Sequence, residues 1–385
     1  MPASRNGQPR GRENSGGLIQ KGKMDIAFLA IVLIILTIGL VMLFSASHFN
    51  ALELYGSSYH FISRQLIFAV PGVVIMLLVS KINYQVLRRL YIPWILFFAS
   101  VVLLIVILLL PPMSEGFDYK RWFYFGGITF QPSEIAKFAV VLLFAHLISL
   151  NYRKMKTFTF GFLLFVVLLV CVCGLVVVEP HLSATILIFL IGVVLMVVGG
   201  TRFAYIGGAG VIGVVLALGA ILSGHVDYGA DRFKYWLDPF ADPKGKGYQI
   251  IQSLYAIGSG GFLGRGIGSS RQKYLWVPEP QNDFIFPIVV EELGFVGGAI
   301  IIILYALLVW RGFTIAMRAP DKFGSLLAIG LSLQAAFNIL VVTNTIPNTG
   351  ISLPFFSYGG TSLLMLLAQM GVVLSISRAS SLKKS

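Results

Sequence analysis

Long apolar runs recur along this chain from Ile26 to Ile376, and they limit how it can fold. A helix that spans a membrane needs about 20 consecutive apolar residues, because the hydrocarbon core is about 30 Å thick. Only 12% of the 385 residues are charged and 57% are hydrophobic, whereas about a quarter of a soluble domain is charged. The chain is therefore predicted to be an all-α polytopic membrane protein.

A hydropathy window of about 19 residues predicts ten membrane helices. They cover residues 25–45, 65–80, 91–110, 133–150, 158–178, 183–199, 203–222, 283–309, 323–345 and 354–376. The polar and basic residues 1–24 have the composition of a disordered tail. The predicted organisation is thus a tail over residues 1–24, a membrane domain over 25–379 and a short tail over 380–385.

The positive charges lie mainly on one side of the predicted helices. Of the 29 Lys and Arg residues, 18 fall in the two tails and in alternate short loops. Cytoplasmic loops carry the excess of Lys and Arg, so both termini are predicted to be cytoplasmic. The net charge of +13 therefore reflects membrane topology, and no nucleic-acid partner is predicted. Cys171 and Cys173 have no neighbouring His or carboxylate, and no metal ligands are assigned.

One long loop, residues 223–282, faces outward and is rich in aromatic residues. Long loops that are not linkers usually carry function. Its stretch GSGGFLGRGIGSSRQK, residues 258–273, combines six glycines with Arg265, Arg271 and Lys273. Glycine-rich backbone can direct its N–H groups at an anion, and the cations add charge. The stretch is either a phosphate or pyrophosphate site or a flexible interfacial loop.

Three carboxylates lie in or beside the predicted helix 283–309. Asp283 is either the N-cap of this helix or a general base in an outward-facing cleft. Glu291 and Glu292 lie deeper, where an ionisable group is functional or paired. We expect one of them to pair with Lys137, because few other cations lie within spans.

Two further segments contain polar residues next to predicted helices. In QPSEIAKF, Ser133 is the predicted N-cap, and Glu134 could instead pair with Lys137, three residues later. In NTIPNTGISLPFFSYGGTS, residues 344–362, prolines and glycines prevent a continuous helix. Ser357 and Tyr358 are polar residues of this segment. Non-helical backbone at membrane depth is tolerated where it lines a wet cavity, so the segment is predicted to be a cavity wall, with a simple hairpin as the alternative.

Three stretches together carry a resemblance to a known family. They are KRWFYFGGITFQPSEIAKF, the stretch from LDPFADPKGKGYQ to NDFIFPIVVEELGF, and IPNTGISLPFFSYGGTSLLMLLAQMG. Over residues 25–379 the chain resembles the SEDS family of shape, elongation, division and sporulation proteins. The basic N-terminal tail and the stretch RQKYLWVPEPQNDFIF are most similar to the FtsW branch of the family. They also resemble SpoVE more than RodA.

The resemblance implies a peptidoglycan glycosyltransferase. Such an enzyme polymerises lipid II at the outer face of the bacterial cytoplasmic membrane, with undecaprenyl pyrophosphate as leaving group. Asp283 matches the family's essential aspartate and would be the general base. The resemblance also implies supporting roles for Lys137, Glu134 and Arg121, and a class B penicillin-binding protein transpeptidase and other division proteins as partners. A divalent cation, Mg²⁺ or Mn²⁺, could help to neutralise the pyrophosphate.

The chain departs from the family pattern at the start of the sixth predicted span. The family often has Pro-Asp-x-Gly there, whereas this chain reads Glu179-Pro180-His181-Leu182-Ser183. No role is carried over to His181. The alternative functions are a lipid II flippase, a scaffold that recruits a transpeptidase, and an elongation or sporulation member of the family. Most acidic residues cluster toward the outer side, which favours an enzyme over a flippase.

Overall fold

A computed structural model of the chain describes residues 19–20, 22–89, 91–110, 121–125, 128–179, 181–211, 234–245, 247–274, 276–277, 279–343 and 352–382. Its helices are α1 (Ile26–Tyr55), α2 (His60–Lys81), α3 (Ile92–Leu109), α4 (Pro132–Leu150), α5 (Leu164–Val178), α6 (Leu182–Val198), α9 (Tyr248–Gly260), α10 (Ile285–Arg318), α11 (Lys322–Val342) and α12 (Gly360–Leu382). A π-helical turn, Thr159–Leu163, leads into α5. The strands β1 (Phe123–Phe125) and β2 (Ile128–Phe130) form an antiparallel hairpin in which Phe123 pairs with Phe130.

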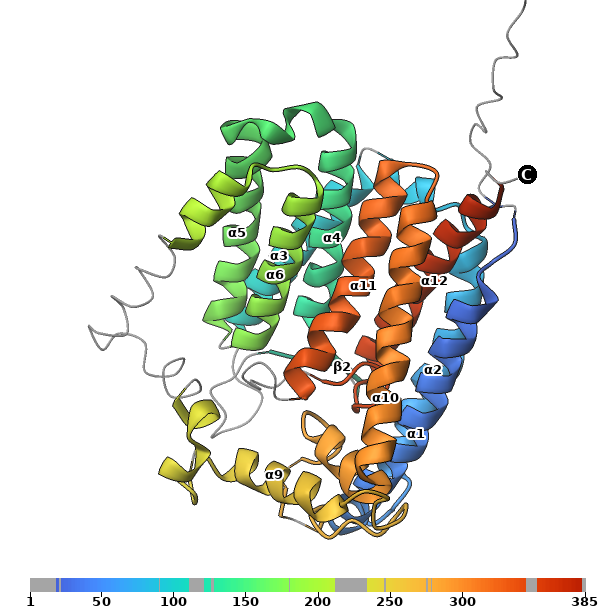
Figure 1. Ribbon diagram of the computed structural model, residues 1–385, viewed down its shortest axis with the longest axis vertical. Coiled ribbons are helices and arrows are strands. Elements are labelled where there is room, and N and C mark those ends of the chain that lie inside the picture. The colour runs from blue at the N-terminus through green and yellow to red at the C-terminus, as the bar shows by residue number, and fades with distance from the viewer. Residues whose placement is uncertain are drawn as a thin grey trace, which may run out of the picture.

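The helices form a bundle whose axes run in roughly the same direction (Figure 1). Eight of the described helices are long and apolar enough to cross a membrane, and α6 is a shorter apolar helix. Residues 203–211 are helical and begin the seventh predicted span, the rest of which lies outside the described residues. The predicted all-α polytopic fold is confirmed.

Several helix ends differ from the predicted spans. Helix α1 continues past the predicted end at Ser45 to Tyr55, because Ser45, Ala46 and Ser47 pack inside the bundle and are buried. Helix α12 begins at Gly360, six residues after the predicted start, because the preceding residues adopt turns. The long loop contains an unpredicted helix, α9, which lies across the end of the bundle (Figure 1).

Helix α10 is interrupted at Gly294, whose φ of 72° and ψ of −174° are not helical. This region of backbone conformation is almost restricted to glycine. The interruption removes the helical bonds from Phe295 and Val296 to the carbonyls of Glu291 and Glu292. Two loop carbonyls replace the acceptors, since Phe295 N–H donates to Gly261 O at 2.9 Å and Val296 N–H donates to Phe262 O at 3.2 Å.

The same loop supplies new donors for the carbonyls released by the break. The backbone N–H of Arg265 donates to the backbone oxygen of Glu291, and that of Gly266 donates to the backbone oxygen of Glu292, each at 3.0 Å. Gly264 must be glycine here, because a Cβ on it would lie 2.2 Å from Glu292 O and its φ is +80°. The broken helix and the glycine-rich loop therefore satisfy each other's backbone groups, as burial in an apolar environment requires.

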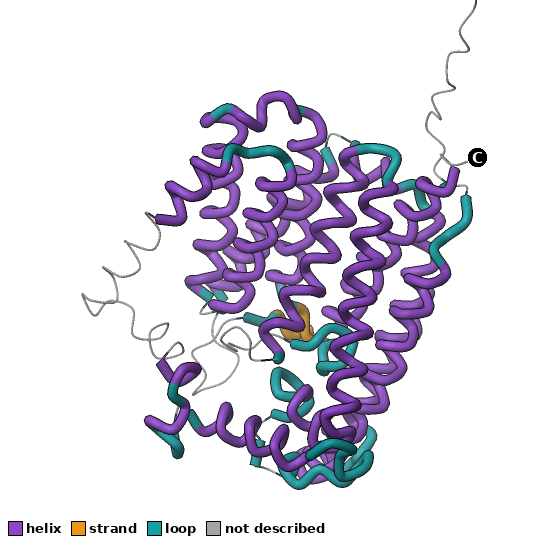
Figure 2. The backbone as a smooth tube through the Cα atoms, in the orientation of Figure 1, coloured by secondary structure: helices purple, strands orange, loops and turns teal. Residues whose placement is uncertain are grey.

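The two ends of the bundle differ in structure. At one end lie α9 and the turn before α10, whereas the hairpin of β1 and β2 lies nearer the middle of the molecule, beside the chain before α12 (Figure 2). At the other end both chain termini meet, where Arg378 Nη1 donates to Gly22 O at 3.0 Å and Asp25 N–H donates to Ser377 Oγ at 3.1 Å. The termini therefore share one face, as the charge distribution predicts. Helix α4 lies inside the bundle and most of its side chains are buried.

Candidate functional site

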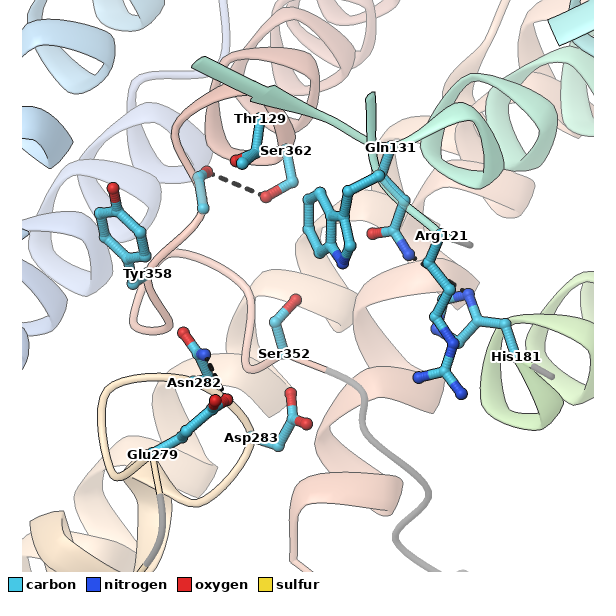
Figure 3. A pocket seen from close by; sticks show the side chains of 12 residues that line it. Arg121, Thr129, Gln131, His181, Glu279, Asn282, Asp283, Ser352, Tyr358 and Ser362 are labelled. Carbon is cyan, nitrogen blue, oxygen red and sulfur yellow. Dashed lines mark hydrogen bonds between the residues drawn. The ribbon is translucent and has the colours of Figure 1, made fainter. Parts of the chain in front are cut away.

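A polar cavity of about 360 Å³ lies between the hairpin of β1 and β2, the turn before α10 and the chain before α12 (Figure 3). Its lining comes from segments that are far apart in the sequence: the residues are Arg121, Trp122, Thr129, Gln131, His181, Glu279, Asn282, Asp283, Ser352, Tyr358, Gly359 and Ser362. The loops around β1 and β2, the start of α6, the turn before α10 and the chain before α12 thus enclose one space. Among the predicted site residues, it brings together Asp283, Arg121 and Tyr358.

The acidic side of this cavity is the turn that precedes α10. Asp283 and Glu279 both line the cavity, and Asn282 Nδ2 donates to Glu279 Oε2 at 2.9 Å. The N-cap of α10 is Phe284, so Asp283 lies one residue outside the cap position. The N-cap interpretation of Asp283 is therefore wrong, and its side chain lines the cavity (Figure 3).

The chain before α12 holds this acidic turn in place. Ser357 Oγ donates to Asn282 O at 2.7 Å, and Tyr358 N–H donates to Gln281 O at 2.8 Å. Buried Gln65 from α2 fixes the same chain, because it accepts a bond from Gly359 N–H at 3.1 Å and donates to Ser357 O at 3.2 Å. The prediction that this segment forms a cavity wall is confirmed for its described residues, 352–362. Ser357 supports the wall from behind, and residues 344–351 lie outside the described part of the chain.

The basic side of the cavity lies opposite the acidic turn (Figure 3). Arg121 Nε donates to the backbone oxygen of Glu179 at 3.3 Å. Gln131 Nε2 lies 3.2 Å from His181 Nδ1. Gln131 was not predicted as a site residue, and His181 was given no role, although it lies where the chain departs from the family's Pro-Asp-x-Gly pattern.

Lys137 pairs with Glu134, and the prediction that it pairs with Glu291 or Glu292 is wrong. Its Nζ lies 2.6 Å from Glu134 Oε1, and only 6% of the lysine side chain is exposed. The two residues are three apart in the first turns of α4, so the helix itself brings them together. This pair lines a small cavity of about 30 Å³, which shares Ser352, Gly359 and Ser362 with the larger one. Helix α4 begins at Pro132 with Gln131 as N-cap, so Ser133 is not the predicted cap.

Glu292 forms a buried ion pair with Lys273 from the glycine-rich loop. The Nζ and Oε1 atoms are 2.9 Å apart and both side chains are 0% exposed. Ser45 Oγ of α1 also donates to Glu292 at 2.5 Å, and Lys273 Nζ donates to Gly268 O at 2.7 Å. The burial of Lys273 contradicts the prediction that it binds substrate. The deep carboxylate was correctly expected to have a cationic partner, but that partner comes from the loop.

Glu291 is the anion that occupies the glycine-rich loop. Its carboxylate accepts bonds from Ser270 Oγ at 2.5 Å, Arg271 N–H at 2.9 Å and Gln272 N–H at 3.3 Å. Arg265 Nε lies 3.8 Å from the same carboxylate. The loop thus binds an anion as its composition indicated, but the anion belongs to the protein. Neither Arg265 nor Arg271 is among the residues that line the polar cavity.

Glu179 lies buried behind the basic side of the cavity. It is 0% exposed, and neither carboxylate oxygen has a hydrogen-bond partner among the described residues. Burial raises the pKa of Glu179 to about 8, although the nearby charge of Arg121 acts to lower it. Its carboxyl group is therefore mainly protonated at neutral pH.

The fold and this cavity define a polytopic membrane protein with a polar site at one membrane face. The sequence profile of the FtsW, RodA and SpoVE family, described as "Cell cycle protein", matches residues 25–382. The chain therefore belongs to this family, the SEDS family.

Relatives match along nearly the whole chain. Stage V sporulation protein E of Bacillus subtilis is 39% identical over 376 residues, covering 94% of this chain and 99% of the relative. A probable peptidoglycan glycosyltransferase FtsW of Trichlorobacter lovleyi is 37% identical, covering 92% of this chain and 93% of the relative.

Two solved structures share the fold. One, described as "Structural coordination of polymerization and crosslinking by a peptidoglycan synthase complex", gives a TM-score of 0.76 at 27% identity, covering 93% of this chain and 98% of that one. The rod shape determining protein RodA of Thermus thermophilus gives a TM-score of 0.66 at 25% identity, covering 92% of this chain and 97% of that one.

The Lys273–Glu292 pair yields a prediction about stability. Lys273→Met leaves the Glu292 charge buried without its partner, which costs about 3–5 kcal/mol. We expect a large fall in the midpoint of thermal unfolding in detergent, and Lys273→Met combined with Glu292→Gln should recover most of it. Lys154→Met, at an exposed site, is the control and should change little. A single variant as stable as the wild type would contradict a structural role for the pair.

Glu179 yields a prediction about pH dependence. In the unfolded chain its carboxyl ionises near the ordinary pKa of 4.5, but in the folded protein it ionises near 8. The folded state thus binds more protons between these values, and the free energy of unfolding falls as pH rises through this range, by about 1.4 kcal/mol per pH unit.

Glu179→Gln should remove this contribution. The gain in thermal stability over the wild type should therefore increase steadily from pH 5 to pH 8, measured in detergent. The control, Glu53→Gln, changes an exposed carboxylate on α1 and should leave the pH profile unchanged. Parallel profiles for Glu179→Gln and wild type would mean that Glu179 is ionised in the folded protein.

Proposed function

We propose that this protein is a peptidoglycan glycosyltransferase that polymerises lipid II into glycan strands at the outer face of the cytoplasmic membrane during cell division. The observation that carries the proposal is the polar cavity with Asp283 on one side and Arg121 and His181 on the other. The names of relatives with 34–37% identity, which include probable peptidoglycan glycosyltransferases, support the same activity.

The reaction joins two lipid-linked sugars. Asp283 accepts the proton of the acceptor's sugar hydroxyl while that oxygen attacks the anomeric carbon of the donor. The bond between this carbon and the diphosphate oxygen breaks, and undecaprenyl pyrophosphate leaves with the bonding electrons. The position of Asp283 one residue before the N-cap of α10 supports this role, because its side chain lines the cavity.

The departing diphosphate needs positive charge, and the basic side of the cavity supplies it. Arg121 presents a guanidinium, whose planar set of N–H donors suits phosphate oxygens. His181, which lies 3.2 Å from Gln131 through its Nδ1, lines the same side and adds a polar ring that can bond to phosphate oxygens. Since Asp283 lies on the opposite side, the geometry supports proton removal and diphosphate stabilisation at separate places (Figure 3). This assignment replaces the glycine-rich loop as the diphosphate site.

A divalent cation fits the acidic side of this cavity. Asp283 and Glu279 offer carboxylate oxygens, and Mg²⁺ is commonly bound by one or two carboxylates together with substrate phosphates. The described residues contain no group of three or more His, Cys, Asp or Glu side chains that could hold a metal by themselves. The cation, when bound with substrate, would supply charge to the diphosphate.

We further propose a class B penicillin-binding protein transpeptidase as partner and the division septum as the site of action. Glycan strands must be cross-linked as they grow, so a polymerase and a transpeptidase act on the same product. The solved relative whose description names a synthase complex that coordinates polymerisation and crosslinking supports this association. The other proposed partners are proteins of the division complex, and the sporulation relative at 39% identity makes a sporulation role the second candidate.

The central test is Asp283→Asn in a lipid II polymerisation assay with the purified protein and its transpeptidase. Removing a general base costs about 10²–10⁴-fold in rate, so we expect polymerisation to fall by at least a hundredfold with normal folding and partner binding. Glu53→Gln is a matched control, since Glu53 is an exposed carboxylate near the end of α1. Normal polymerisation by Asp283→Asn would reject the catalytic role and favour the flippase or scaffold function.

Arg121 gives a second prediction in the same assay. A hydrogen bond to a charged group is worth about 1.5–3 kcal/mol, so Arg121→Gln should lower kcat/KM for lipid II by roughly 10–100-fold. Arg64→Gln is the control, because Arg64 lies in α2 outside the lining of the cavity. Equal effects of the two substitutions would indicate a general influence of surface charge instead of a diphosphate site.

A further inference from the structure

A second cavity lies at the opposite end of the bundle, where the chain termini meet. It has a volume of about 390 Å³ and is formed by the start of α1, the end of α10 and the end of α12. Its lining residues include Lys23, Asp25 and Ile26 from the first segment, Arg311, Ile315 and Arg318 from α10, and three serines from α12. By the positive-inside rule this end of the bundle faces the cytoplasm.

One acidic residue in this cavity is already neutralised. Arg311 forms a two-point ion pair with the Asp25 carboxylate. Its Nη2 lies 2.9 Å from Oδ2, and its Nε lies 3.0 Å from Oδ1. The Asp25 carboxylate also caps α1 by accepting a bond from Phe28 N–H at 2.9 Å. Asp25 and Arg311 therefore form a closed pair that fixes the geometry of the cavity and leaves no net charge.

Two cations in the cavity have no such partner. Lys23 and Arg318 are both exposed, and neither forms an ion pair with another described residue. The backbone of Lys23 is nevertheless fixed, because its N–H donates to Ser381 Oγ at 2.9 Å. The cavity therefore holds two positive charges that no described residue neutralises, and their frame is ordered, which is an arrangement suited to a phosphate group.

The cavity also borders apolar surface. Ile26 lines it and is 72% exposed. On α10, Trp310 precedes Arg311 and Met317 precedes Arg318, and these two side chains are 68% and 76% exposed. A tryptophan at this depth is typical of the membrane interface. Phosphate-binding charge next to exposed apolar side chains matches a molecule with an anionic headgroup and acyl chains.

We propose that this cavity binds the headgroup of an anionic phospholipid from the inner leaflet. Lys23 and Arg318 contact its phosphate, and the acyl chains lie against Ile26 and the neighbouring face of α10. Basic pockets between helices on the cytoplasmic side of a membrane protein are suited to anionic lipids. The bound lipid joins the first span to α10 and α12, so it stabilises the folded bundle by binding to it in preference to the unfolded chain.

The test measures thermal unfolding of the full-length protein in a neutral detergent during titration with phosphatidylglycerol. Wild-type protein should be stabilised at low lipid concentration, and phosphatidylcholine should have little effect. The variant Lys23→Gln/Arg318→Gln should require roughly tenfold more phosphatidylglycerol for the same shift. Native mass spectrometry should show fewer retained phosphatidylglycerol molecules on this variant than on the wild type.

The matched control is Arg153→Gln/Lys154→Gln, which removes two exposed charges from the same membrane face outside the cavity. It should respond to phosphatidylglycerol like the wild type. Equal weakening in both double variants, or no weakening in Lys23→Gln/Arg318→Gln, would overturn the proposal. The last measurement replaces the lipid with soluble glycerophosphoglycerol. If this compound raised the unfolding midpoint as much as the intact lipid does, the cavity would recognise free phosphate esters, and the proposal of a lipid site would be overturned.

Discussion

The exchange of hydrogen bonds between the interrupted helix α10 and the glycine-rich loop is the interaction on which the outer half of the molecule depends. A break at Gly294 leaves two N–H groups and two carbonyls of α10 without helical partners. The loop satisfies all four through Gly261, Phe262, Arg265 and Gly266. Unsatisfied backbone groups in an apolar environment would each cost several kcal/mol. The loop and the first turns of α10 therefore stabilise each other.

Charged side chains reinforce this junction. Glu291 accepts hydrogen bonds from backbone N–H and hydroxyl groups of the loop. Glu292 forms an ion pair with Lys273 and accepts a hydrogen bond from Ser45 of α1. A buried ion pair gives little net stability compared with an apolar pair, but its geometry is specific. Two adjacent carboxylates thus fix one loop and one helix in a single arrangement. The turn that carries Asp283 begins α10, so its position follows from this junction.

Much of the fold could be predicted from the sequence, because hydropathy reports directly on membrane spans. The polar, non-helical segment before α12 was also recognisable as a cavity wall. Its prolines and glycines interrupt the helix at membrane depth, where non-helical backbone is tolerated beside a wet cavity. The partner of Lys137 was not predicted correctly, although the i,i+3 alternative with Glu134 was visible. The pairing of Lys273 with Glu292 depends on loop geometry that includes positive φ at Gly264, Gly266 and Gly268, which sequence does not report. Helix α9 was not predicted from the sequence, because its 13 residues are fewer than a membrane span needs and its last residues include glycines.

The polar cavity draws its walls from the hairpin near Arg121, the start of α6, the turn before α10 and the chain before α12. These segments lie across more than half of the polypeptide, and the last of them precedes the final span. During synthesis the earlier spans enter the membrane before Tyr358 and Ser362 have left the ribosome. A nascent or truncated chain therefore lacks one wall of the cavity, and the site is assembled only when the last helix is inserted.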